Sequence, residues 1–250
     1  MTPELTAAVC RPSVQELGGA FVECPKTLRR ARQLGLSGWA FFSAGRGGAL
    51  GDVRPDTVAA ALGFVAPALV NEGWNAARRV TTPAEVAAQS LAECCRWGAE
   101  HLDGFGGVDR LVELTERVVL AADPAGLPLF AAWRAMPVPV DGPGSRAALL
   151  LHLLREHRCG AHLLAVRTAG LSPVEAIISG PDGEPGAMAF GWQPPYPPLG
   201  PLVRRRAWAE ALTDRIAGQA YEVLAVAERV ELAGLLDSAA AEVKATSMAE

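Results

Sequence analysis

The sequence lacks the features that mark several large classes of protein. No apolar run reaches the ~18 residues that a membrane-spanning helix needs, and the first residues show no basic-then-apolar secretory pattern. Five cysteines are present without a C-x-x-C pair, which argues against a zinc site or a redox pair. We therefore expect a cytoplasmic protein with reduced cysteines and no membrane contact.

Aromatic residues and clustered positive charge are also scarce. Aromatics make up 6% of the chain and include six Trp, so the core must consist mainly of Ala, Leu and Val. The formal net charge is −4, and the basic residues are scattered except for Arg204, Arg205 and Arg206. Because nucleic-acid binders usually carry a basic patch, this distribution argues against DNA as a partner.

No complete catalytic or metal-binding signature is present. The chain has no H-E-x-x-H motif, no phosphate-binding P-loop and no dinucleotide fingerprint in a strand-to-helix setting. His152, His157 and His162 are spaced by five, and five helical steps turn the chain by about 500°. The three imidazoles therefore cannot share one helix face, and we predict neither a metal nor a cofactor.

Helix-start signals dominate what is present. A cap residue, a Pro at the first helical position and a Glu at the third occur together at Thr82–Glu85 and again at Ser172–Glu175. Apolar residues at helical spacing predict a helix over 108–122. The Gly-rich segment 39–51 is expected to join a helix to a loop. Further helices are expected from about residue 14, over 27–34, over 56–77 with a bend at Pro67, over 128–135, from Ser145, over 202–225 and over 227–244.

Residues 149–180 predict a helix-turn-helix, in which a long helix, a Gly-containing turn and a short second helix follow one another. Residues 179–192 hold P-D-G-E-P-G between short apolar arms, which is typical of a β-hairpin or wing. The Pro/Gly-rich segment 136–145 is the expected domain boundary. We therefore predict a mainly α protein, with a multi-helical domain over 1–140 and a winged-helix-like module with two C-terminal helices over 141–250.

Two residues are candidates for binding a small molecule. Arg46 lies among glycines, which allow the backbone to approach a ligand closely, and its guanidinium can bind a carboxylate or phosphate. The alternative is an Arg in a surface turn that pairs with Asp52. Trp192 follows the predicted hairpin and can line the mouth of a pocket, or it can pack in the core.

Three further residues are candidates for acid–base chemistry. His157 and His162 can act as a general base or donate hydrogen bonds to a substrate, or they can pack at a helix junction. Glu93 has a raised pKa and can act as acid or base if it is buried beside Trp97. Otherwise it pairs with Arg96.

The second helix of the predicted helix-turn-helix lacks the residues that read DNA. A recognition helix needs polar and basic side chains near its N-terminus. The segment Pro173–Ile178 has no Arg, Lys, Asn or Gln, and Glu175 would face phosphate. This segment therefore predicts a helix-turn-helix that serves as a scaffold.

The chain resembles, over nearly its whole length, a large family of actinobacterial proteins named helix-turn-helix for their fold. Family members usually have Gly where Ala161 precedes His162, and a fuller region where this chain has a Pro-rich connector. The name describes a fold, and fold does not supply function. The resemblance rests on Gly45-Arg46, Leu50-Gly51, residues 64–70, residues 154–158, His162, residues 169–172, Glu175-Ala176, Gly191-Trp192 and Thr213-Asp214.

The chain is also similar in length to the carboline-forming Pictet–Spengler cyclases of actinobacterial natural-product pathways. That similarity implies a cofactor-independent enzyme of specialised metabolism that acts on a small aromatic amine or amino acid. An amine and an aldehyde condense to an iminium, the aromatic ring attacks it, and a base removes the ring proton. Such chemistry needs a carboxylate anchor, for which we choose Arg46, and one acid/base group, His157, His162 or Glu93.

Two other functions stay open. The first is a ligand-sensing winged-helix transcriptional regulator, in which the N-terminal half binds the ligand. The second is a catalytically inert homodimer or partner-binding protein that uses its Ala-rich terminal helices as a surface.

Overall fold

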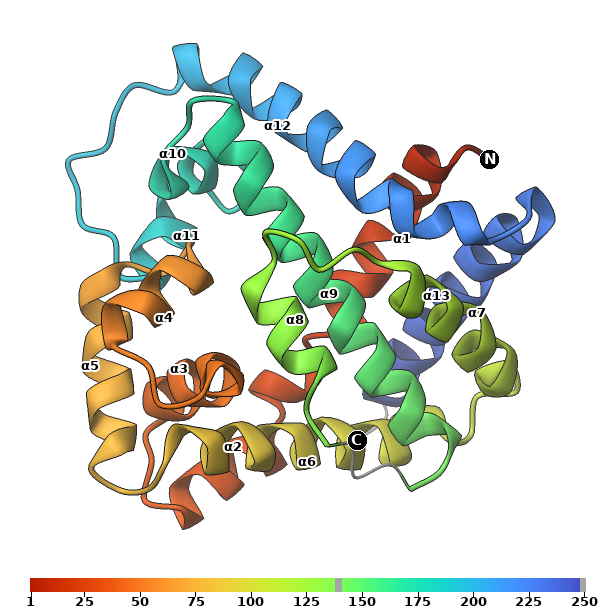
Figure 1. Ribbon diagram of the computed structural model, residues 1–250, viewed down its shortest axis with the longest axis horizontal. Helices are drawn as coiled ribbons and strands as arrows, with labels where there is room; N and C mark the ends of the chain where they lie inside the picture. The colour runs from red at the N-terminus through yellow and green to blue at the C-terminus, as the bar shows by residue number, and fades with distance from the viewer. Residues whose placement is uncertain (138–140, 248–250) are drawn as a thin grey trace.

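Helices joined by turns, and by one longer connector over residues 190–199, account for the described chain, residues 1–137 and 141–247 of the computed structural model (Figure 1). No strand occurs in these residues, and the mainly helical class predicted from the sequence is confirmed. The elements are α1 (Pro3–Leu17), η1 (Ala20–Glu23), α2 (Pro25–Gln33), α3 (Gly38–Gly47), η2 (Gly48–Leu50), α4 (Pro55–Leu62), α5 (Pro67–Arg78), α6 (Pro83–Leu102), α7 (Val108–Ala121), α8 (Pro128–Arg134), α9 (Pro143–Thr168), α10 (Pro173–Ile178), α11 (Gly183–Ala189), α12 (Gly200–Gly218), η3 (Gln219–Val223) and α13 (Val226–Ser247).

Proline starts eight of the described α-helices. Its fixed φ suits the first helical position, where the missing N–H would have no partner in the helix. Both predicted capping boxes form, at Thr82 with Glu85 and at Ser172 with Glu175. In the second box Ser172 Oγ accepts from the Glu175 amide, and Glu175 accepts from the Ser172 amide over 2.7 Å.

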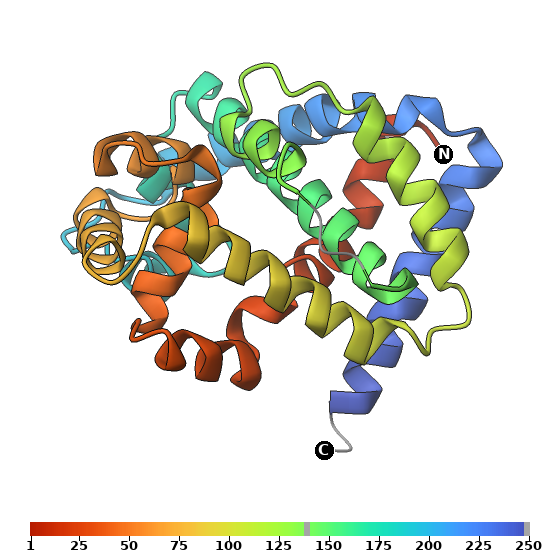
Figure 2. The ribbon, with the colours of Figure 1, turned by 60° about the horizontal axis from the view of Figure 1, so that its bottom comes forward.

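The long helix α9 crosses the molecule and packs against α6, α7, α8 and α12 (Figures 1 and 2). Buried residues lie on most sides of its first five turns, as expected for a helix that is apolar all round. Its closest approach to α6 is at Gly98, where a Cβ atom would overlap the Gly144 carbonyl oxygen and lie 2.5 Å from the Ala148 Cβ. The two backbones therefore meet where the facing residues are glycine or alanine.

Two expectations for the N-terminal half are corrected by the structure. The segment 39–51 is mostly helical, because Ser37 caps α3 and Gly48 packs so closely on the Pro83 carbonyl that a Cβ would overlap it. The glycines of this segment therefore allow close helix packing as well as turns in the backbone. The predicted helix 56–77 is two helices, α4 and α5, because Gly63 ends the first with φ +68°.

The predicted β-hairpin over 179–192 is wrong, and with it the wing. This segment forms the helix α11, whose Ala187 is fully buried. Pro185 is compatible with helix here because it lies in the first turn, where an amide donor is not needed. A two-stranded hairpin also needs a sheet or a helix to cover its apolar face, whereas this segment packs on α10 as a short helix.

The buried residues form one large core and a second, smaller cluster. The smaller cluster joins the end of α9 to α10, α11 and α12 through residues such as Val166, Ala176, Ala187 and Leu202. It therefore holds the helix-turn-helix against its neighbours. The division of the chain at about residue 140 stays a prediction. Within the described ranges, each helix is too short or too polar to cross a membrane.

Candidate functional site

The guanidinium of Arg46 on α3 is paired with a carboxylate of the protein itself. Arg46 Nε lies 2.8 Å from Glu156 Oε1 and Nη2 lies 3.0 Å from Oε2, while the Glu156 side chain is fully buried. Burial opposes the charged form of Glu156, but the charges of Arg46, His152 and Arg155, together with the hydrogen bonds from Arg46, outweigh burial and lower the pKa of Glu156 to about 2. The alternative partner Asp52 pairs instead with Arg78. A role for Arg46 as ligand anchor stays a prediction.

The imidazole of His157 lies in the interface between α9 and α8. Its ring meets the Phe130 ring edge-on, with 5.0 Å between the centroids. Burial, assisted by the nearby Arg134 charge, lowers the pKa of His157 to about 4. The side chain is therefore neutral at pH 7, and its role as an acid or base stays a prediction.

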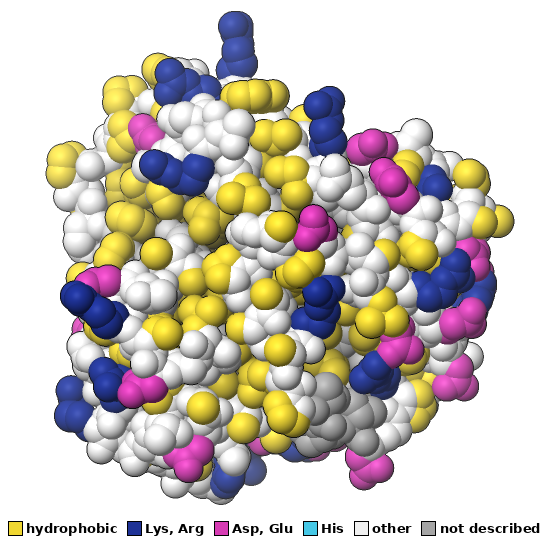
Figure 3. All heavy atoms as spheres, in the orientation of Figure 1, with side chains coloured by type: hydrophobic (Ala, Val, Ile, Leu, Met, Phe, Trp, Pro, Cys, Tyr) yellow, Lys and Arg dark blue, Asp and Glu magenta, His cyan; other side chains and the backbone are white. Residues whose placement is uncertain are grey.

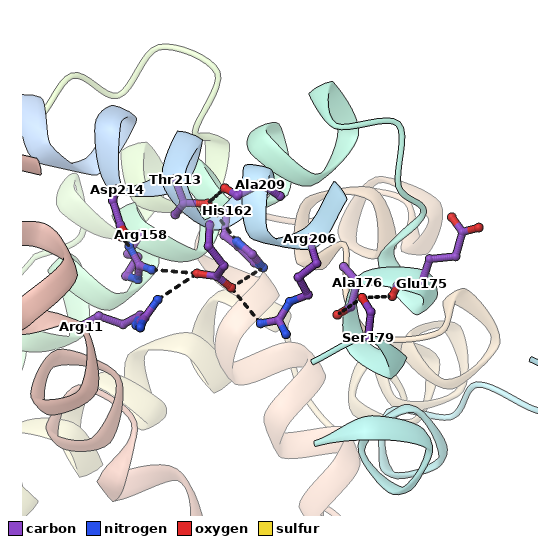
Figure 4. Close-up of polar contacts among 11 residues, drawn as sticks. Arg11, Arg158, His162, Glu175, Ala176, Ser179, Arg206, Ala209, Thr213 and Asp214 are labelled. Carbon is purple, nitrogen blue, oxygen red and sulfur yellow. Dashed lines mark hydrogen bonds and ion pairs between the residues drawn. The ribbon is translucent and has the colours of Figure 1, made fainter. Parts of the chain in front are cut away.

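His162, five residues after His157 on α9, faces α12 (Figure 4). Its Nδ1 lies 2.9 Å from Thr213 Oγ1, and that hydroxyl donates to the Ala209 carbonyl. Its other ring nitrogen, Nε2, lies 3.9 Å from the Glu210 carboxylate. Burial lowers the pKa of His162 to about 4 although Glu210 acts in the opposite direction, so this imidazole is also neutral at pH 7.

Glu210 is the centre of an ion-pair cluster that joins α1, α9 and α12 (Figure 4). Arg11 lies 3.0 Å from it, Arg206 2.8 Å and Arg158 3.4 Å, while Arg158 also pairs with Asp214 over 2.9 Å. The arginines come from three helices, so the cluster fixes how those helices pack. This arrangement indicates a structural role.

Glu93 pairs with its neighbour on α6. Arg96 Nη2 donates to it over 2.7 Å, and the Thr27 hydroxyl donates to it over 3.2 Å. Glu93 therefore pairs with Arg96, which was the alternative to burial beside Trp97. A catalytic role for Glu93 stays a prediction.

A groove of about 530 Å³ lies between α4 and the helix-turn-helix. We call it the α4–α10 groove, and Figure 3 shows hydrophobic side chains gathered on this face of the molecule. Trp192 lines it and also packs against the smaller core cluster, and its Nε1 donates to the Phe64 carbonyl over 2.8 Å. A role for Trp192 in ligand binding stays a prediction. The apolar part of the lining is Ala59, Ala60, Gly63, Pro67, Leu163, Pro173 and Trp192.

Two charged residues, Arg167 and Asp56, lie at the α4–α10 groove. Asp56 pairs with Arg54 over 3.3 Å. Arg167 donates to the Leu171 carbonyl over 3.2 Å and belongs to none of the ion pairs in the described residues. Sequence reasoning missed Arg167. The signal that could have found it is its position in the last turn of the helix before the helix-turn-helix turn.

A smaller hollow of about 160 Å³ lies on the other side of α4, between α4, α8 and α9. We call it the inner hollow. It contains Arg46 and Glu156 in its lining, whereas His157, His162 and Glu93 line neither this hollow nor the groove. The structure therefore does not bring the four polar candidates together in one site. In the described part of the chain no cluster of His, Cys, Asp and Glu could hold a metal ion.

The second helix of the helix-turn-helix, α10, turns much of its surface into the protein. Ala176 and Ile178 are buried, and Val174 and Ile177 pack against the smaller core cluster. Its single charged side chain, Glu175, is engaged in the capping box. As the sequence predicts, this helix offers no donor that could read the edge of a base pair.

Comparison with known proteins agrees with this geometry. A family model described as a helix-turn-helix family matches residues 7–195, which is more than half of the chain. The protein belongs to this helix-turn-helix family. No curated protein and no solved structure matches the chain. Membership of a helix-turn-helix family, predicted from the sequence, is thus confirmed, whereas nothing in these comparisons supports the similarity to Pictet–Spengler cyclases.

Proposed function

We propose that this helix-turn-helix protein binds a small organic carboxylate with an apolar body in the α4–α10 groove. The observation that carries the proposal is the position of Arg167 beside a wall formed by Leu163, Pro173 and Trp192. Small-molecule sites are mostly apolar and contain a few polar groups that orient the ligand. A volume of about 530 Å³ falls in the range of such sites.

The charge at the groove selects the sign of the ligand. Asp56 already has Arg54 as a partner over 3.3 Å, whereas Arg167 donates to the neutral Leu171 carbonyl and meets the Glu175 carboxylate only through a longer-range attraction that helps to lower the pKa of Glu175. A guanidinium binds a carboxylate through strong charge-assisted hydrogen bonds. We therefore assign the role of carboxylate anchor to Arg167. Arg46, the candidate chosen from the sequence, already forms an ion pair with Glu156.

The helix-turn-helix then serves as one wall of a binding site. Arg167 comes from its first helix and Pro173 from its second. The proposal is compatible with a ligand-sensing regulator and with an enzyme acting on an amino acid, since both bind a carboxylate. The cyclase function needs in addition an acid/base group at the ligand, and His157, His162 and Glu93 lie away from this groove.

Titration calorimetry with a matched pair of ligands tests the proposal. We expect 3-phenylpropionate to bind more tightly than its uncharged amide. Arg167→Gln should weaken the carboxylate by about 10- to 100-fold and leave the amide unchanged. Arg204→Gln, a substitution of an exposed arginine outside the groove, should change neither ligand. Equal binding of the two ligands, or no binding of either, contradicts the proposal.

A DNA titration tests the regulator separately. We expect weak binding to duplex DNA, because α10 presents no basic side chain. A steep fall of the binding constant with rising salt would show that several phosphates are contacted, and the regulator would then be favoured.

A further inference from the structure

The α4–α10 groove and the inner hollow share two lining residues. Leu163 and Ala60 line both spaces. Leu163 projects from α9 across to the chain after α4, where a Cβ on Gly63 would lie 2.6 Å from Leu163 Cδ2. The Leu163 side chain is partly exposed, so it is not held on all sides by the core. The two spaces therefore adjoin across a residue that can change rotamer.

The inner hollow has the size and the lining of a site for one ring. Its volume of about 160 Å³ is close to that of an engineered cavity of ~150 Å³ that binds benzene. Its walls include the apolar side chains of Leu62, Leu127 and Phe130. The charges at its end, Arg46 and Glu156, are paired with each other, and Glu156 also accepts from Arg155 over 3.1 Å.

We infer that the inner hollow is a second compartment of the proposed site, and that Leu163 is the residue that decides ligand length. The inference rests on the proposed function. The ligand class is an aryl carboxylate with a flexible spacer, whose carboxylate is bound by Arg167 and whose terminal ring fills the inner hollow.

The spacing along α9 sets the length of that spacer. Arg167 and Gly160, which lines the inner hollow, are seven residues apart, or about 10 Å along a helix that rises about 1.5 Å per residue. A ligand must therefore place its ring roughly 10 Å from its carboxylate. Of two simple aryl carboxylates, 6-phenylhexanoate reaches this distance and 3-phenylpropionate does not.

Calorimetry with these two ligands tests the inference. We expect 6-phenylhexanoate to bind wild-type protein at least about tenfold more tightly than 3-phenylpropionate, because its extra methylenes and its ring leave water. Ala61 lines the inner hollow and not the groove. Ala61→Leu should therefore remove the advantage of the long ligand and leave the affinity for 3-phenylpropionate unchanged, which also shows that the variant is folded.

A second variant acts in the opposite direction. Leu163→Ala removes the partition and should increase the ratio of the two affinities, whereas Leu164→Ala, in the inner lining alone, should leave the partition in place. Equal affinities in wild type, or an advantage that survives Ala61→Leu, would overturn the inner compartment. Failure to bind 3-phenylpropionate, or insensitivity of its binding to Arg167→Gln, would instead overturn the proposed function.

Discussion

The buried carboxylate of Glu156 accepts two hydrogen bonds from the guanidinium of Arg46, over 2.8 Å and 3.0 Å. The pair joins α3 to α9 across the centre of the molecule. Removing one partner of a buried pair leaves the other charge without compensation, which costs far more than the pair contributes to stability. The two residues are therefore best tested by the folding of the protein.

Glu156→Gln should lower the free energy of unfolding by about 3–5 kcal/mol. The amide keeps the shape of the side chain but leaves the Arg46 charge buried and unbalanced. Urea unfolding followed by circular dichroism measures the change. The matched control is Glu231→Gln, which breaks a two-bond pair with Arg110 at the surface and should cost far less. Equal losses in the two variants would show that burial is not the cause.

Acidification should destabilise the protein between pH 6.5 and pH 4. Burial lowers the pKa of both His152 and His157 to about 4, whereas in the unfolded chain these groups titrate near pH 6.5. Between these values the unfolded state binds more protons, so stability falls as pH falls, by up to about 1.4 kcal/mol per pH unit for each group. Above pH 6.5 this contribution is complete and constant.

Urea unfolding at pH 7.5 and at pH 5 measures this loss, and His157→Phe should reduce it because one of the titrating groups is then absent. The Phe side chain keeps an aromatic contact with Phe130. Stability that is unchanged between the two pH values would contradict the neutral, buried state of these imidazoles.

Ser172→Ala should destabilise the protein by about 1 kcal/mol. The hydroxyl of Ser172 accepts from the Glu175 amide at the start of α10, and Ala leaves that amide without its partner. Ser172→Gly is the matched comparison and should cost only a few tenths of a kcal/mol, because Gly is tolerated at this position. If Ser172→Gly loses more stability than Ser172→Ala, the capping box does not stabilise this turn. Thermal unfolding in a calorimeter resolves the difference.

Gly98→Ala should destabilise the protein by about 1–3 kcal/mol, the usual cost of overpacking. The added Cβ would overlap the Gly144 carbonyl oxygen where α6 meets α9, and the backbones would have to separate. Gly104→Ala is the control, since a Cβ there has nothing within 4 Å. The denaturant midpoints of the two variants provide the comparison. An unchanged midpoint for Gly98→Ala would mean that α6 and α9 are not tightly packed at their crossing.

The local signals of the sequence predicted what is local in the structure. Prolines and capping boxes place helix starts, as at Thr82 and Ser172, because they act on amides within a few residues. The lack of basic side chains in the six-residue α10 could also be read from the sequence. Its composition alone shows that no side chain there can donate to a base edge. The predicted hairpin over 179–192 failed because a turn-forming P-D-G-E-P-G run between apolar arms cannot show that Ala187 has a helical surface to pack on.

The sequence by itself determined the helical class, because helix starts depend on neighbouring residues, and the resemblance of its motifs indicated the helix-turn-helix family. Only the tertiary structure decided which arginine is available to a ligand. Arg46 and Glu156 are 110 residues apart, and nothing in the sequence pairs them. The fold places Arg46 of α3 against the buried Glu156 of α9 and leaves Arg167 beside the groove. Which charged residues pair with each other depends on their distance in the folded protein, and the order of residues in the sequence does not give that distance.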